Sequence, residues 1–270
     1  MGQENEMSFL DHLEELRWHV IKATAAIIVA ATVAFLAKGF LFDVLIFGPT
    51  KPDFFTYEFL CNASRLMGFE SFCDTNFDFE VQSRTMAGQF SAHIWTSITF
   101  GFIIAFPFVI YQFWKFISPG LLHKEKNSSR GFIFISSILF FIGVLFGYYI
   151  VCPLSINFLG TYSVAELVHN DFDLNSYIGL IRASTLASGL IFELPIIIYF
   201  LTKIGLVTPK FLKKNRKYAL VIVLVFAAII TPPDIASQVI VAIPVLVLYQ
   251  VSILISRIVL RNQKRKETNG

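Results

Sequence analysis

Residues 131–151 read GFIFISSILFFIGVLFGYYIV and contain no charged side chain. A run of about 20 apolar residues is what an α-helix needs to cross the hydrocarbon core of a bilayer. The whole chain shares this character, because 55% of its 270 residues are hydrophobic, 15% are charged and 30 are phenylalanine. Soluble domains carry about 25% charged residues. The sequence therefore predicts an all-α integral membrane protein.

Apolar stretches on both sides of this one predict six transmembrane helices in a single polytopic domain, residues 1–270. The expected spans are residues 18–42, 92–117, 131–151, 177–201, 218–230 and 235–255. The fifth is shorter than the roughly 20 residues that a spanning helix needs. We therefore expect short fifth and sixth spans, with the fifth either buried among other helices or set in a thinned bilayer. Prolines within three spans favour a bent, concave bundle.

The basic residues indicate the orientation. With the N-terminus inside, most of the 22 Lys and Arg residues fall on the inner side, and the positive-inside rule then places both termini in the cytoplasm. The large loop at about residues 43–91 falls outside. It carries Cys61 and Cys73, which either form a disulfide in an oxidising compartment or remain as two free thiols. Cys152, at the outer end of the third span, is expected to pack as a small apolar residue.

Several functional classes lack their signatures in this sequence. The acidic N-terminus, without Lys or Arg in its first 16 residues, is unlike a secretory signal peptide. Neither a nucleotide-binding loop nor metal-ligand spacing of His and Cys is found. The motifs HExxH and GxSxG are absent as well. We therefore expect no enzyme activity, no cofactor, no metal and no nucleic-acid partner, and the energy for any transport must come from elsewhere.

Acidic residues next to apolar sequence are candidates for function. The stretch SFLDHLEELRWHV, residues 8–20, predicts a helix capped by Ser8. Glu14 is placed to pair with Arg17, whereas Glu15 has no basic residue one turn away. Glu15 is therefore either part of a solvated helix face or an acid that awaits a cation from a partner. The apolar face of this helix, expected at the membrane interface, comprises Phe9, Leu13, Leu16 and Val20.

Two further acids lie in the inner loop and inside a span. Glu125 is surrounded by basic residues in the loop between the second and third spans, where ordinary solvation is the plain alternative. Glu193 lies within the fourth span, just before Pro195, and an ionisable group inside a membrane is a functional candidate by default. Its alternative is a structural hydrogen bond to a neighbouring helix. Arg182 lies about 16 Å away along the same helix, too far to pair with Glu193 directly.

Four separated motifs occur in order along the chain: FLDHLEELR, PFVIYQFWKFISPGLLHKEK, FELP, and TPPDIASQ followed by AIPVLVLYQ. Together with the six spans, they resemble the TatC family, the multi-spanning receptor subunits of the twin-arginine protein translocase. The resemblance covers about residues 8–261. It implies a protein of the cytoplasmic (inner) membrane that binds twin-arginine signal peptides on folded precursors. It also implies TatA and TatB as single-span partners, self-association in a multimeric complex, and transport driven by the proton-motive force.

The resemblance also implies a signal-peptide site at the cytoplasmic face. Glu15 and Glu125 are the two acids of that site, and Leu16, Arg17 and Phe116 stand beside them in the matching motifs. The chemistry fits, because the planar guanidinium of arginine matches a carboxylate in a bidentate fork, which a lysine cannot reproduce.

Inside the membrane, the resemblance matches Glu193 to the family's intramembrane acid. It matches Gln238 to the sixth span, where partner helices are expected to dock. Arg182 and the long outer loop depart from the family pattern, and no role transfers to them. The alternative from the residues alone is a proton-coupled secondary transporter of a small solute that uses Glu193. Such a transporter predicts internal symmetry and several facing acids, which the sequence lacks.

Overall fold

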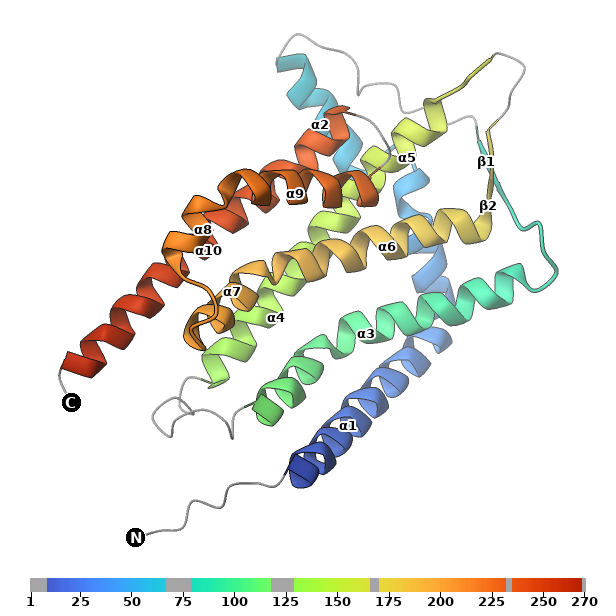
Figure 1. The fold of residues 1–270 in the computed structure, drawn as a ribbon. Helices are drawn as coiled ribbons and strands as arrows, with labels where there is room; N and C mark the ends of the chain where they lie inside the picture. Colours follow the sequence, from blue (N-terminus) through green and yellow to red (C-terminus); the bar gives the residue numbers. More distant parts are fainter. Residues whose placement is uncertain (1–8, 67–78, 118–128, 166–169, 232–234, 269–270) are drawn as a thin grey trace. The chain divides into compact units, whose positions relative to one another are not determined.

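A computed structural model describes residues 9–66, 79–117, 129–165, 170–231 and 235–268, most of them helical (Figure 1). Within these ranges, five helices are long and apolar enough to cross a membrane: Leu13–Leu36, Gly88–Ile117, Gly131–Thr161, Leu174–Lys203 and Ser237–Gln263. The polytopic helical fold is thus confirmed. Contacts divide the chain into two compact units, Met1–Lys38 with Phe90–Ile138, and Gly39–Gln89 with Leu139–Gly270.

The first unit is built on two long helices that run side by side, α1 (Phe9–Leu36) and α3 (Gly88–Ile117) (Figure 1). They touch at Gly101, where an added Cβ would lie 2.6 Å from the backbone nitrogen of Ala31. Only glycine permits an approach this close between two helix backbones. The expected cap of α1, Ser8, lies outside the described residues. The unit also takes in the beginning of α4 (Ser129–Phe146).

In the second unit, the third span is longer than the sequence predicted. After α4 the chain passes through a π-helical turn, Gly147–Val151, directly into α5 (Cys152–Thr161). The helical run therefore ends at Thr161 instead of residue 151. Pro153 stands in the first turn of α5, a position that tolerates proline.

The fourth span is broken at Glu193 into α6 (Leu174–Phe192) and α7 (Leu194–Lys203). Asp173 caps α6 by accepting hydrogen bonds from the backbone N–H groups of Asn175 and Ser176. Pro195 lies in the first turn of α7. Proline has no N–H and its ring crowds the preceding turn, so the helix is interrupted just before it.

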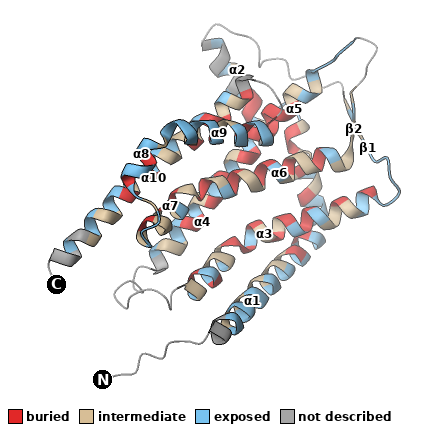
Figure 2. Ribbon diagram, in the orientation of Figure 1, coloured by how far each residue is buried: buried red, intermediate tan, exposed pale blue. Residues whose placement is uncertain are grey.

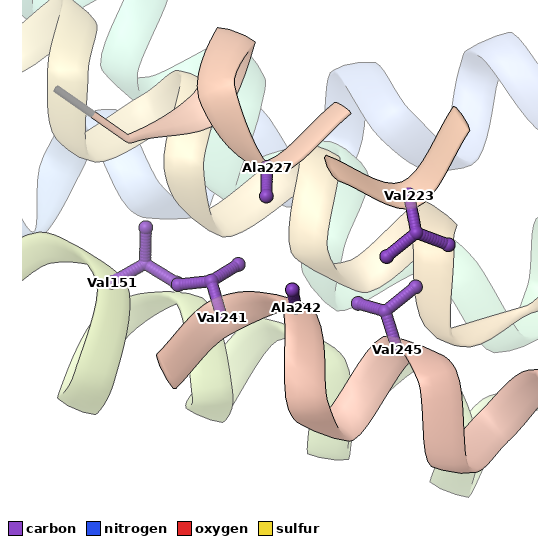
Figure 3. Close-up of a cluster of buried hydrophobic side chains, with 6 residues drawn as sticks. All are labelled: Val151, Val223, Ala227, Val241, Ala242 and Val245. Carbon is purple, nitrogen blue, oxygen red and sulfur yellow. The ribbon is translucent and has the colours of Figure 1, made fainter. Parts of the chain in front are cut away.

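The C-terminal helices are α8 (Pro209–Lys214), α9 (Arg216–Ile230) and α10 (Ile235–Thr268). Figure 3 shows small and branched side chains of α9 and α10 meeting Val151 of the π-helical turn in a buried cluster: Val151, Val223, Ala227, Val241, Ala242 and Val245. With 15 residues, α9 is short, as predicted. The prediction of a short sixth span is wrong, because α10 has 34 residues. Pro244 lies inside α10 without ending it, and the Arg- and Lys-rich tail continues it since these residues favour helix.

The expected outer loop, residues 43–91, contains regular structure that the sequence did not reveal. It forms α2 (Phe55–Leu66) and a strand, β1 (Glu80–Gln82). This strand pairs in parallel with β2 (Asp171–Asp173), which precedes α6. Three residues are too few for an alternating pattern to be recognised.

The two described cysteines lie in this second unit. Cys61 of α2 is disulfide-bonded, whereas its expected partner, Cys73, lies outside the described residues, so the pairing of these two stays a prediction. Cys152 is a buried free thiol, which confirms that it packs as a small apolar residue.

Candidate functional site

From residue 13 onward, one stripe of α1 is shielded from the surroundings while its other side chains are exposed (Figure 2). Glu15 and His19, one turn apart, are half-buried members of this stripe, whereas the residues between them are exposed. The stripe continues to the buried Ala31 and Ala34. The polar pair therefore occupies the N-terminal end of the α1 face that packs against α3.

Glu15 carries an unsatisfied polar atom. Its Oε2 is buried and has no hydrogen-bond partner among the residues that the structure describes. Buried polar groups are nearly always hydrogen-bonded, because desolvation without a partner is costly. A buried carboxylate oxygen of this kind favours the binding of a cationic donor.

His19 is anchored by α3. Its Nδ1 lies 2.7 Å from Oε1 of Gln112, and Gln112 itself is only 5% exposed. The imidazole ring also meets Phe116 in an edge-to-face contact, with ring centroids 6.4 Å apart. Glu15, His19, Gln112 and Phe116 thus gather at one end of the α1–α3 pair.

Two of the other residues expected at this site lie on a different face of α1, and a third is not described. Leu16 and Arg17 are exposed on α1, away from the stripe that carries Glu15. Glu125 lies outside the described residues. The apolar residues Leu13, Leu16 and Val20 are 45%, 37% and 53% exposed, so they form an outer face of α1, as an interfacial helix requires.

Glu193 lies at the break between α6 and α7 and is 6% exposed. Its backbone joins the two helices, because its N–H donates to the carbonyl of Leu190 and its carbonyl accepts from the N–H groups of Ile196 and Ile197. The acid is therefore buried within protein at an irregular point of a span. Arg182 is half-buried on the same helix, and its Nε has no hydrogen-bond partner within the described ranges.

Gln238 has a structural role that the sequence did not suggest. Its Nε2 donates to the backbone carbonyl of Leu224 at 3.0 Å, which ties the start of α10 to α9. Nearby Thr231 lies at the end of α9, but the rest of the TPPD motif falls outside the described residues.

Sequence reasoning missed His19 and Gln112. His19 follows Glu15 by four residues, so the helical spacing rule places both on one face. Gln112 is a lone amide within an apolar span, which is itself a signal for a buried hydrogen bond. In the part of the chain that the structure describes, no group of three or more His, Cys, Asp and Glu residues could hold a metal ion.

Comparison with known proteins gives consistent relatives over nearly the whole chain. Residues 11–244 match the family described as Sec-independent protein translocase protein (TatC). The TatC protein of Blattabacterium sp. subsp. Periplaneta americana (strain BPLAN) is 45% identical, over 94% of this chain and 97% of that relative. TatCy of Bacillus subtilis (strain 168) is 33% identical, over 97% of this chain and 93% of its own length. A crystal structure of the twin arginine translocase receptor TatC covers 92% of this chain and 99% of the solved chain, with 33% identity and a TM-score of 0.68.

Proposed function

The chain belongs to the TatC family of Sec-independent protein translocase proteins, and we infer that it is the receptor subunit of a twin-arginine translocase. It is accordingly a multi-pass membrane protein and a component of a transport complex. A proton-coupled transporter of small solutes, the alternative from the residues alone, is not supported, since the relatives are protein translocase components throughout.

The observation that carries the proposal at residue level is the buried Oε2 of Glu15, which has no hydrogen-bond partner in the part of the chain that the structure describes. Arginine is permanently charged and presents a planar fork of N–H donors. A carboxylate that is already partly desolvated binds such a fork strongly, because the hydrogen bonds are charge-assisted and little water has to be removed. We propose that Glu15 accepts one arginine of a twin-arginine signal peptide.

The second arginine requires a second acid. Glu125 belongs to the loop that directly follows α3, the helix that carries Phe116, and the positive-inside count assigns this loop to the cytoplasmic side together with the start of α1. We therefore propose Glu125 as the second acceptor. Leu16 and Arg17 are exposed on α1, where they are available to the parts of the peptide that flank the arginine pair.

The remaining roles concern assembly and later steps. We propose the inner membrane as the location, with both termini cytoplasmic, and TatA and TatB as partners. Glu193 is a buried acid at a helix break within a span, a setting that suits a step after peptide recognition. Because transport of folded cargo demands an opening larger than one such chain supplies, the complex is proposed to be multimeric and driven by the proton-motive force.

The test compares two neighbouring acids on the same helix. In purified full-length protein, Glu15→Gln is expected to weaken binding of a fluorescent twin-arginine peptide by about 10- to 100-fold, as for loss of a hydrogen bond to a charged group. Glu14→Gln is the matched control, because Glu14 is exposed and should bind like wild type. Equal affinities for the two variants would exclude Glu15 from the site. Glu125→Gln is measured in the same series.

A further inference from the structure

The hydrogen bond between His19 and Gln112 selects one tautomer of the neutral imidazole. Oε1 of Gln112 is an amide carbonyl oxygen and can only accept a hydrogen bond. At 2.7 Å from it, Nδ1 of His19 must therefore carry the proton and donate. In the neutral ring the other nitrogen, Nε2, then holds a lone pair and is a hydrogen-bond acceptor.

This acceptor has no partner in the described part of the chain, where the bond to Gln112 and the contact with Phe116 are the interactions of the His19 ring. The ring is only half-buried, so a ligand can reach it. His19 also lies one helical turn beyond Glu15 on the same stripe of α1, about 6 Å along the helix axis. Two acceptors, a carboxylate and an imidazole nitrogen, therefore stand next to each other without donors from the described residues.

A guanidinium group has the geometry to use both. It carries five N–H donors in a plane, and a carboxylate takes two of them at most. A donor left unpaired in a partly buried site weakens binding. We propose that Nε2 of His19 is a second acceptor for the arginine bound at Glu15, and that Gln112 is the positioning residue that keeps Nε2 in its acceptor form. This inference rests on the proposed function of Glu15.

The consequence is a preference for arginine over lysine. The ammonium group of lysine is a compact point charge that can face Glu15 but has no planar fork to span two separated acceptors, whereas the guanidinium plane does span them. A site that hydrogen-bonds one more donor of the correct ligand discriminates against the ligand that lacks it. His19 is therefore assigned as a specificity-determining residue and not merely as part of the α1–α3 packing.

The test measures the affinities of twin-arginine and twin-lysine peptides for full-length variants in detergent. His19→Phe keeps an aromatic ring against Phe116 but removes the acceptor. It is expected to weaken the arginine peptide about tenfold and to leave the lysine peptide unchanged. His19→Gln offers an amide oxygen near the position of Nε2 and should restore most of the arginine affinity. Gln112→Leu removes the acceptor of the Nδ1 hydrogen bond, so that Nε2 is no longer held in its acceptor form. The arginine peptide is then expected to bind with an affinity between those of wild type and His19→Phe.

The outcomes separate this inference from the proposed function. If Glu15→Gln weakens binding while His19→Phe leaves the ratio of the two affinities unchanged, the role of His19 is wrong and that of Glu15 stands. Equal weakening of both peptides by His19→Phe, without rescue by His19→Gln, would show that the residue serves packing alone. If Glu15→Gln has no effect, the proposed site itself fails. Size-exclusion profiles and melting temperatures verify that each variant is folded.

Discussion

The polar side chains in the helices of this protein fall into two groups. Some form hydrogen bonds within the protein, and others have a buried atom with no hydrogen-bond partner among the described residues. Thr202 Oγ1 donates to Ser256 Oγ at 2.8 Å, deep between α7 and α10. Gln112 is likewise used internally, by His19. Oε2 of Glu15 is buried without such a partner among the described residues. Because an unsatisfied buried group is costly, a ligand that supplies the missing hydrogen bond gains free energy at this oxygen.

Some glycines stabilise the packing of helices because they have no side chain, which lets two helix backbones approach closely. A Cβ on Gly143 of α4 would lie 2.7 Å from the backbone carbonyl oxygen of Ser188 in α6. That backbone atom cannot move aside without shifting the helix. Gly143→Ala is therefore expected to destabilise the protein by about 1–3 kcal/mol, the usual cost of overpacking.

The control lies in the same helix. A Cβ on Gly131 would meet nothing within 4 Å, and alanine favours helix over glycine by about 1 kcal/mol at open positions. Gly131→Ala should thus leave stability equal or slightly raised. Thermal unfolding in one detergent compares the two variants. A Gly143→Ala variant as stable as wild type would mean that α4 and α6 do not cross at this point.

At the scale of elements, hydrogen bonds between helices explain how the short α9 is held. With 15 residues it is too short to span a bilayer. In lipid the hydrophobic effect does not drive a helix against its neighbours. It is attached to α10 by the buried cluster of Figure 3 and by the bond from Gln238 to the carbonyl of Leu224. Gln238 therefore belongs to the structure of the α9–α10 pair, whatever it also contributes to partner docking.

Gln238→Leu tests this role. The substitution removes the hydrogen bond that Nε2 of Gln238 donates to the carbonyl of Leu224, and a loss of roughly 1 kcal/mol in stability is expected. Peptide binding at Glu15 should not change, because that site lies in the other compact unit. Gln250→Leu is the matched control, since Gln250 is exposed on the same helix. If both variants were equally stable, the bond to Leu224 would carry no net stabilisation.

At the scale of the molecule, length and hydropathy were enough to predict the membrane class, most span positions and the short fifth helix. These properties depend on local composition, which a single sequence contains. The β1–β2 pair and the contact between His19 and Gln112 were not predictable, because they join residues far apart in the chain. The length of α10 was missed for a local reason: the predicted span ends at residue 255, where the apolar sequence gives way to basic residues, but the helix continues through these residues to Thr268.

Stability of the whole molecule at alkaline pH depends in part on Tyr57, in α2 and outside the spans. Its hydroxyl donates to the carbonyl of Pro49 at 2.7 Å, and burial raises the pKa of Tyr57 well above its usual range. In the unfolded chain the phenol ionises near pH 10, so deprotonation favours unfolding. The contribution of Tyr57 is complete below about pH 10 and is lost as the pH rises toward the folded-state pKa.

We therefore expect the melting temperature to fall more steeply above about pH 10 in wild type than in Tyr57→Phe. The phenylalanine variant loses the bond to Pro49, which costs about 1 kcal/mol at neutral pH, but it has no phenol to ionise. The two melting curves should accordingly converge as the solution becomes alkaline. Parallel curves across this range would mean that Tyr57 ionises equally easily in the folded and unfolded chains, and that α2 is not packed closely enough to shield it.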